Sequence, residues 1–133
     1  MGSQDRVWLF MHKCVANPTI VDDTDQVLTC TFIDSGKRMF CLVVYGLNNY
    51  LERISLWNQI QNLACSILDL WIVIGDFNSI LFAEEKIGPL VGTTSNVEFL
   101  HYTEMAGLTE INLVGSMFIW YRRHLNGIKS KTW

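Results

Sequence analysis

The chain has 133 residues, of which half are hydrophobic and 17% are charged, and its net charge at neutral pH is −3. This length fits one domain with a hydrophobic core. The charged fraction is below the quarter typical of globular proteins, which indicates a well-buried fold or a piece of a larger one. No basic run is longer than Arg122-Arg123, which excludes a strong electrostatic surface for nucleic acid.

The cysteines and the apolar runs set further limits. The four cysteines, at positions 14, 30, 41 and 65, lack the spacing of a zinc site. Three of them lie in apolar sequence and are expected to be small core residues. We expect no membrane span, because no run of 18 apolar residues occurs. No secretory signal is visible, so we expect an intracellular location, with the nucleus among the compartments that remain open.

The first part of the chain is expected to contribute outer strands. Residues 1–6 are polar, and we expect them to be disordered. The apolar segment Val7–Met11 is predicted to be a strand. Turn signals at Asn17-Pro18 and at Asp22-Asp23 still leave room for a short edge strand over Val15–Val21.

A hairpin is predicted next. Residues 26–34 alternate in a pattern typical of a strand, and Asp34-Ser35-Gly36-Lys37 is typical of a hairpin loop. Arg38–Tyr45 is the expected return strand. Because both faces of the two strands are largely apolar, we expect them near the centre of a sheet.

A helix is predicted after the hairpin. Asn49 can cap it, with Glu52 three residues later completing a capping box. Apolar residues then recur at helical spacing, with Trp57 expected in the core. They are Leu51, Ile54, Trp57, Ile60, Leu63 and Ile67. Arg53 falls off this stripe.

The next apolar stretch, Trp71 to Ile74, is predicted to be a strand over residues 70–75 that is buried on both faces. Strand, helix and strand then form a crossover, which places the two strands parallel or in neighbouring layers. Asp76 and Asn78 follow the break at Gly75. If the segment stays extended, their side chains point the same way and could hold a cation, bind a phosphate or orient a water. Alternatively they are ordinary turn residues that bond their own backbone.

The last part of the chain is predicted to hold a loop over 79–92 and a helix that is capped by Ser95 with Glu98 and ends near Gly107. The apolar residues that mark this helix are Val97, Leu100, Met105 and Leu108. A strand over Met117–Tyr121 can pair with Gly127–Trp133. The resulting fold class is α/β, with helices packed on a mixed sheet. The most basic group is Arg122, Arg123, His124, Lys129 and Lys131, which is either a solvated hairpin face or a binding surface.

Several short motifs occur in a characteristic order. They are Val44-Tyr45-Gly46-Leu47-Asn48; Arg53 with Leu56-Trp57; Gly75-Asp76-Phe77-Asn78 with Ile80-Leu81 and Glu85-Lys86; Gly107-Leu108; Phe118-Ile119-Trp120; and Ile128-Lys129-Ser130-Lys131. Over residues 7–133 the chain resembles the endonuclease/exonuclease/phosphatase superfamily, which has the DNase I-like fold. In particular it resembles the endonuclease domains of plant LINE-type (non-LTR) retrotransposons.

This resemblance implies a sandwich of mixed sheets flanked by helices, and magnesium-dependent hydrolysis of phosphodiesters in DNA. It implies that Asp76 orients or deprotonates the attacking water and that Asn78 helps to hold the metal and the phosphate. It also implies that Tyr45 touches the phosphate and that Asn48 lines the same site. Such positioned donors suit in-line attack at a phosphodiester.

The chain also departs from the family pattern. The family's metal-binding glutamate near the N-terminus has no counterpart, because Glu52, Glu84 and Glu85 lie elsewhere. Its C-terminal Asp-His pair is likewise missing, since the histidines at 12, 101 and 124 do not match it. Asp76 and Asn78 alone would form an incomplete magnesium site.

We therefore expect a truncated, central fragment of an endonuclease domain that is weakly active or inactive. The alternative is a remnant without catalysis that binds nucleic acid or protein through Arg122, Arg123 and an exposed sheet edge. Exposed edges would also favour self-association.

Overall fold

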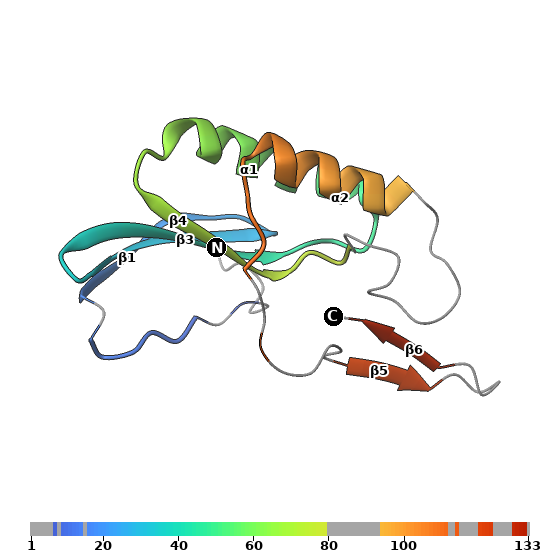
Figure 1. Ribbon diagram of the computed structural model, residues 1–133, viewed down its shortest axis with the longest axis horizontal. Helices are drawn as coiled ribbons and strands as arrows, with labels where there is room; N and C mark the ends of the chain where they lie inside the picture. Colours follow the sequence, from blue (N-terminus) through green and yellow to red (C-terminus); the bar gives the residue numbers. More distant parts are fainter. Residues whose placement is uncertain are drawn as a thin grey trace. The chain divides into compact units, whose positions relative to one another are not determined.

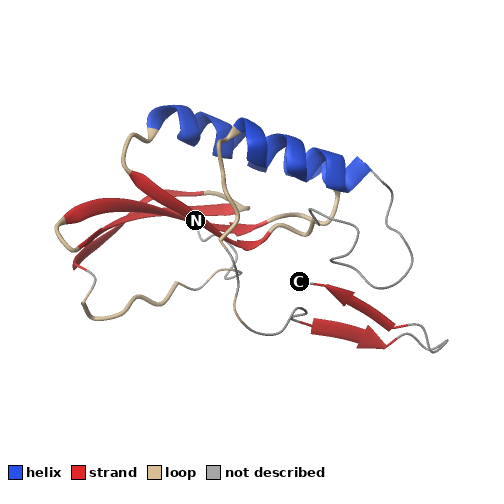
Figure 2. Cartoon of the chain, in the orientation of Figure 1, coloured by secondary structure: helices blue, strands red, loops and turns tan. Residues whose placement is uncertain are grey.

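The computed structural model has the α/β architecture that the sequence predicts (Figures 1 and 2). It describes residues 7, 9–14, 16–79, 94–111, 114, 120–123 and 129–132. The chain divides into two units, Met1–Asn78 and Ser79–Trp133, and each is described by itself.

The first unit contains a mixed four-stranded sheet in the order β1-β2-β3-β4. Its strands are β1 (Ala16–Asp23), β2 (Val27–Asp34), β3 (Lys37–Tyr45) and β4 (Leu70–Asp76). The pairs β1–β2 and β2–β3 are antiparallel, whereas β3 and β4 are parallel. The predicted edge strand, central hairpin and crossover are therefore confirmed.

A two-residue turn closes the β2–β3 hairpin. Ser35 and Gly36 both have positive φ, of 50° and 76°, as a type I′ turn requires. The turn sets the register, which pairs Asp34 with Lys37 and, further from the turn, Cys30 with Cys41. Side chains of β2 and β3 therefore alternate between the two faces of the sheet as predicted.

The helix α1 (Tyr50–Ser66) lies over one face of this sheet (Figure 1). Asn49 caps it as predicted, since its side chain accepts a hydrogen bond of 3.0 Å from the Leu51 N–H. The predicted apolar stripe is only partly right, because Leu51 and Ile54 are exposed. The buried row consists of Arg53, Leu56, Trp57 and Ile60. These positions have the spacing of one helix face. The predicted stripe contains Trp57 and Ile60 but not Leu56 or Arg53, and Arg53 is placed elsewhere because it is charged.

The predicted strand over Val7–Met11 is wrong, since the described residues of this segment adopt no strand. Val7, Leu9 and Met11 instead pack against a buried cluster of Cys30, Cys41 and Val43. Their side chains cover the face of the sheet that is opposite the buried Val27, Thr29, Leu42 and Val44. The apolar character of this segment thus reflects packing on a face of the sheet and not backbone pairing at its edge.

The predicted burial of the 70–75 strand on both faces is also wrong. Within the described residues, β4 is an edge strand that pairs only with β3. Leu70 and Ile74 are exposed, and the three residues between them are half-buried. A continuous apolar run does not reveal whether a strand has one neighbour or two.

The second unit contains α2 (Thr94–Met105). Its end is near Gly107 as predicted, with the Leu108 N–H bonded to the Thr103 carbonyl at 2.9 Å and the Gly107 N–H bonded to Glu104 at 3.0 Å. Of the apolar residues that mark this helix, Val97, Leu100 and Met105 are exposed, whereas Phe99 and Ala106 are buried. Ser95 lies inside the helix and not at its cap.

The predicted C-terminal hairpin is confirmed where it is described. Strands β5 (Trp120–Arg123) and β6 (Lys129–Thr132) pair antiparallel, with Arg123 opposite Lys129. The loop predicted over 79–92 and the first residues of the strand predicted from Met117 lie outside the described residues, except Ser79.

Two of the four thiols belong to the core, and not three as predicted. Cys30 and Cys41 are buried, whereas Cys14 and Cys65 are exposed. In the part of the chain that the structure describes, no helix is long and apolar enough to cross a membrane.

Thr29 offers a direct test of the core under α1. Its side chain is fully buried, and its hydroxyl has no hydrogen-bond partner among the described residues. Because an unpaired buried hydroxyl costs about 1–3 kcal/mol, we expect Thr29→Val to raise the free energy of unfolding by about 1 kcal/mol in urea titrations. The matched control is Thr31→Val, on the same face of β2 but half-buried, which should change stability by less than about 0.5 kcal/mol. A lower free energy of unfolding for Thr29→Val, with little change for Thr31→Val, would contradict this packing.

Candidate site at the ends of strands β3 and β4

Strands β3 and β4 end side by side. Their parallel register pairs Tyr45, the last residue of β3, with Asp76, the last residue of β4. Ligands of α/β sheets commonly bind beyond the carboxyl ends of parallel strands. We call the set Tyr45, Asn48, Asp76 and Asn78 the β3–β4 edge site, and it contains every site residue that the sequence predicts.

The two loops that leave these strands touch through their backbones. The Gly46 N–H donates to the Asp76 carbonyl at 2.7 Å, and the Asn78 side-chain amide donates to the Gly46 carbonyl. A Cβ atom at Gly46 would overlap the Phe77 carbonyl oxygen, and one at Gly75 would overlap the Val44 carbonyl oxygen. The Gly75 φ of 135° is likewise accessible mainly to glycine. Two glycines therefore permit the close approach of the loops.

Asp76 and Asn78 form a turn. The Asp76 Oδ1 atom accepts a 2.8 Å hydrogen bond from the Asn78 N–H, and Asn78 has a left-handed φ of 48°. The turn alternative is therefore confirmed, and the expectation of an extended segment with both side chains pointing the same way is wrong. The turn leaves the second carboxylate oxygen of the exposed Asp76 outside this bond.

A buried glutamine fixes the loop after β3. Gln26, which is only 2% exposed, accepts a hydrogen bond of 3.0 Å from the Leu47 N–H. Its amide nitrogen donates to the Glu52 carbonyl at 3.0 Å and to the Ser55 hydroxyl at 2.9 Å. The Gln26 side chain thus links the start of β2, the loop after β3 and the first turns of α1. Its amide oxygen and nitrogen both have hydrogen-bond partners inside the protein.

A buried arginine holds the same loop from the helix. Arg53 is 2% exposed, and its Nη1 atom donates to the Leu47 carbonyl at 2.8 Å and to the Asn48 carbonyl at 2.9 Å. Bonds from a charged donor are stronger than neutral ones and offset part of the cost of burying the charge. They fix the backbone of Asn48 and leave its exposed side chain available.

An aromatic pair holds the loop after β4. The Phe77 ring stacks on the fully buried Trp57 of α1, with 5.6 Å between centroids and 5° between planes. Trp57 is therefore a core residue, as predicted. Because Phe77 lies between Asp76 and Asn78, the stack also fixes these two residues relative to α1.

The structure brings the predicted residues together to different degrees. Tyr45 and Asp76 are register partners, and Asn78 reaches the Tyr45 side through its bond to Gly46. Asn48 joins them through the loop that it shares with Gly46. It also directly precedes Asn49, the N-cap of α1, and so leads into the helix. The supporting role of Gln26 was missed, since nothing in its local sequence distinguishes it from a solvent-exposed glutamine.

The chemistry of the site suits a hard cation only in part. Asp76 and Asn78 offer carboxylate and amide oxygens, which are ligand types that magnesium accepts, but Mg²⁺ needs six ligands. Within the described ranges, no three His, Cys, Asp or Glu side chains gather as ligands for a metal ion. These residues could therefore hold Mg²⁺ only with water or phosphate oxygens completing its shell.

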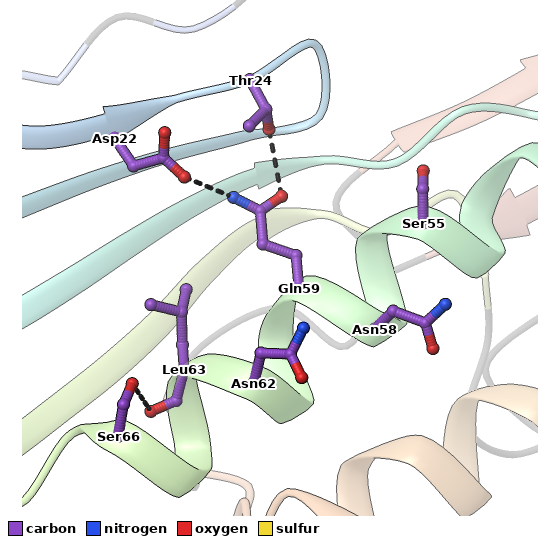
Figure 3. A pocket seen from close by; sticks show the side chains of 8 residues that line it. All are labelled: Asp22, Thr24, Ser55, Asn58, Gln59, Asn62, Leu63 and Ser66. Carbon is purple, nitrogen blue, oxygen red and sulfur yellow. Dashed lines mark hydrogen bonds between the residues drawn. The ribbon is translucent and has the colours of Figure 1, made fainter.

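A polar groove lies elsewhere in the first unit, between α1 and the turn that joins β1 to β2 (Figure 3). Its lining residues are Asp22, Thr24, Ser55, Asn58, Gln59, Asn62, Leu63 and Ser66. Gln59 donates to the Asp22 carboxylate at 3.0 Å and accepts from the Thr24 hydroxyl at 3.1 Å. Because Gln59, Asp22 and Thr24 bond to one another, we interpret these hydrogen bonds as a structural link between α1 and the sheet and not as a binding site.

The sequence was also compared with known proteins. No protein-family model matches it, and the search of curated proteins gives no significant match.

The contact between the two loops can be tested at Gly46. We expect Gly46→Ala to lower the free energy of unfolding by at least about 3 kcal/mol, because its Cβ would overlap backbone atoms that cannot rotate away. Gly36→Ala is the matched control, since Gly36 has open space around it and loses only the left-handed preference of glycine, about 1–2 kcal/mol. Equal costs in urea unfolding would contradict the close approach.

Proposed function

We propose that the chain derives from a metal-dependent DNA endonuclease with a DNase I-like fold, of the type found in LINE retrotransposons, and that its own hydrolytic activity is weak or absent. The proposal rests on the resemblance of the motifs. The observation that supports it best is the pairing of Tyr45 with Asp76, with Asn78 bonded to the adjoining Gly46.

In this proposal, a phosphodiester lies across the ends of β3 and β4. The Asp76 carboxylate orients a water for attack on phosphorus and takes up its proton, while one of its oxygens stays bonded to the Asn78 N–H. The Tyr45 hydroxyl and the Asn48 amide donate to phosphate oxygens. Such fixed donors matter most where negative charge develops in the transition state.

Asp76 and Asn78 would hold a magnesium ion, which when bound neutralises charge on the phosphate. Weak activity is proposed because two protein ligands leave most of the coordination shell to water and substrate.

The second candidate function is binding without catalysis. It is favoured by the β5–β6 hairpin, whose register sets Arg123 opposite Lys129 and Tyr121 opposite Lys131. A hairpin that combines basic and aromatic residues suits a nucleic-acid strand. The outer strands of the described sheet, β1 and β4, carry exposed Ile20, Val21, Leu70 and Ile74, and such edges also suit a partner protein or a second copy of the chain.

A plasmid-nicking assay with magnesium tests the first candidate. We expect slow conversion of supercoiled to nicked plasmid, reduced at least about 100-fold by Asp76→Asn. The matched control is Asp69→Asn, which removes the same charge just before β4, where Asp69 pairs with Arg38 at 2.7 Å. Asp69→Asn should leave the rate unchanged.

Absence of nicking by the wild-type chain would exclude residual catalysis by this chain. Equal nicking by both variants would contradict the role proposed for Asp76. A gel shift at low salt then tests the binding candidate, because phosphate contacts are strongest there. Unchanged DNA mobility at low salt would contradict its nucleic-acid form.

A further inference from the structure

Two buried thiols lie opposite each other in the central hairpin. Cys30 of β2 and Cys41 of β3 are register partners, and they are 2% and 4% exposed. The Cys30 thiol donates to the Cys41 carbonyl at 3.5 Å. Neither residue belongs to the β3–β4 edge site, and all four cysteines of the chain are free thiols in this structure.

The hairpin geometry suits a bond between these thiols. In an antiparallel pair, directly opposite side chains leave the same face of the sheet, and their Cα atoms are about 4.5–5.5 Å apart. Disulfides join Cα atoms that are about 4.4–6.8 Å apart. The type I′ turn at Ser35-Gly36 fixes this register, so closing the bond would not require a change of strand pairing.

We propose that Cys30 and Cys41 are a site of reversible oxidation, which closes to a disulfide across the β2–β3 hairpin when hydrogen peroxide reaches them. In the first step, one thiolate attacks a peroxide oxygen, an S–O bond forms, the O–O bond breaks and water leaves after proton transfer. In the second step, the other thiolate attacks that sulfur, the S–S bond forms and the S–O bond breaks, releasing a second water. The thiols lose two electrons and the peroxide gains them.

The surroundings of the pair make this oxidation slow and dependent on local opening. Burial raises the pKa of both thiols, that of Cys41 to about 11 with a further contribution from Cys30, so little thiolate exists at neutral pH. The cover over the cluster includes Val7, Leu9 and Met11, which adopt no helix or strand. Lifting Val7, Leu9 and Met11 breaks apolar contacts with the cluster. Such an opening is a local event and not global unfolding.

The bond should also be easy to reduce. Directly opposite Cβ atoms in antiparallel strands are about 4.5–5.5 Å apart, whereas a disulfide prefers about 3.5–4.5 Å. Closure therefore draws the strands together, and strained disulfides have higher reduction potentials than relaxed structural ones. The oxidised pair is thus a reversible state and not a permanent crosslink.

Peroxide treatment of the full chain carrying Cys14→Ser and Cys65→Ser tests the proposal, because both replaced residues are exposed. Cleavage after Lys37 and Arg38, which lie between the two cysteines, separates the peptides unless a disulfide joins them. We expect a joined pair of peptides that is short of two hydrogen atoms and separates after dithiothreitol. The wild-type chain with its exposed thiols alkylated beforehand provides a second sample, and the added Cys41→Ser change should abolish the joined product.

Two results would overturn the proposal. In the first, Cys30 and Cys41 stay unlinked in both samples at a peroxide concentration that fully oxidises Cys14 and Cys65 in a wild-type chain that was not alkylated. The other is sulfinic or sulfonic acid on Cys30 or Cys41 as the main product, since a partner in reach would trap the sulfenic acid first.

Discussion

The β3–β4 edge site depends on the backbone contact between Gly46 and the Asp76–Phe77 peptide. Parallel pairing brings Tyr45 and Asp76 to the same edge of the sheet, but two strand ends usually diverge into their own connections. Here the Gly46 N–H continues the pairing to the Asp76 carbonyl, and the Asn78 side chain returns to the Gly46 carbonyl. Any side chain at position 46 would separate the loops, and the polar groups that they carry would no longer share one edge.

Three buried side chains of the first unit, Gln26, Arg53 and Trp57, hold the two loops in this contact. Gln26 and Arg53 bond to the N–H and carbonyl groups of Leu47 and Asn48, while the Trp57–Phe77 stack holds the other loop. Two of these three supports are polar groups inside the protein, where an unsatisfied donor costs more than a satisfied one contributes. The Gln26 and Arg53 bonds therefore contribute mainly to a specific loop geometry. The loop keeps one conformation because other conformations would leave buried polar groups unpaired.

Much of the fold could be predicted from periodicity and turn chemistry. The Asp34–Lys37 turn, the Asn49 cap and the apolar run at Trp71–Ile74 each depend on neighbours in sequence, and each element appears where expected. The failures concern relations between distant segments. Local patterns do not encode tertiary contacts. They therefore cannot show whether β4 has one neighbouring strand or two, or whether Val7–Met11 pairs with a strand or only covers a face of the sheet.

The proximity of the candidate residues was predictable, whereas their conformation was not. Tyr45 and Asp76 meet because they end adjacent parallel strands, which the predicted crossover permits. The left-handed Asn78 and the bond that turns its amide to Gly46 arise from the loop contact. Arg53 shows a related limit. Its charge suggests exposure, but it lies on the inner face of α1, where the Leu47 and Asn48 carbonyls accept its hydrogen bonds and make burial favourable.

The proposed function requires that the ends of β3 and β4 form one oxygen-rich site for a hard cation and a phosphate. Paramagnetic broadening of backbone amide signals by Mn²⁺, a substitute for magnesium, tests it directly. We expect the strongest broadening at Gly46, Phe77 and Asn78, with much of it lost in Asp76→Asn. Broadening centred on the Asp22–Gln59 groove, or broadening that Asp76→Asn leaves unchanged, would contradict the claim.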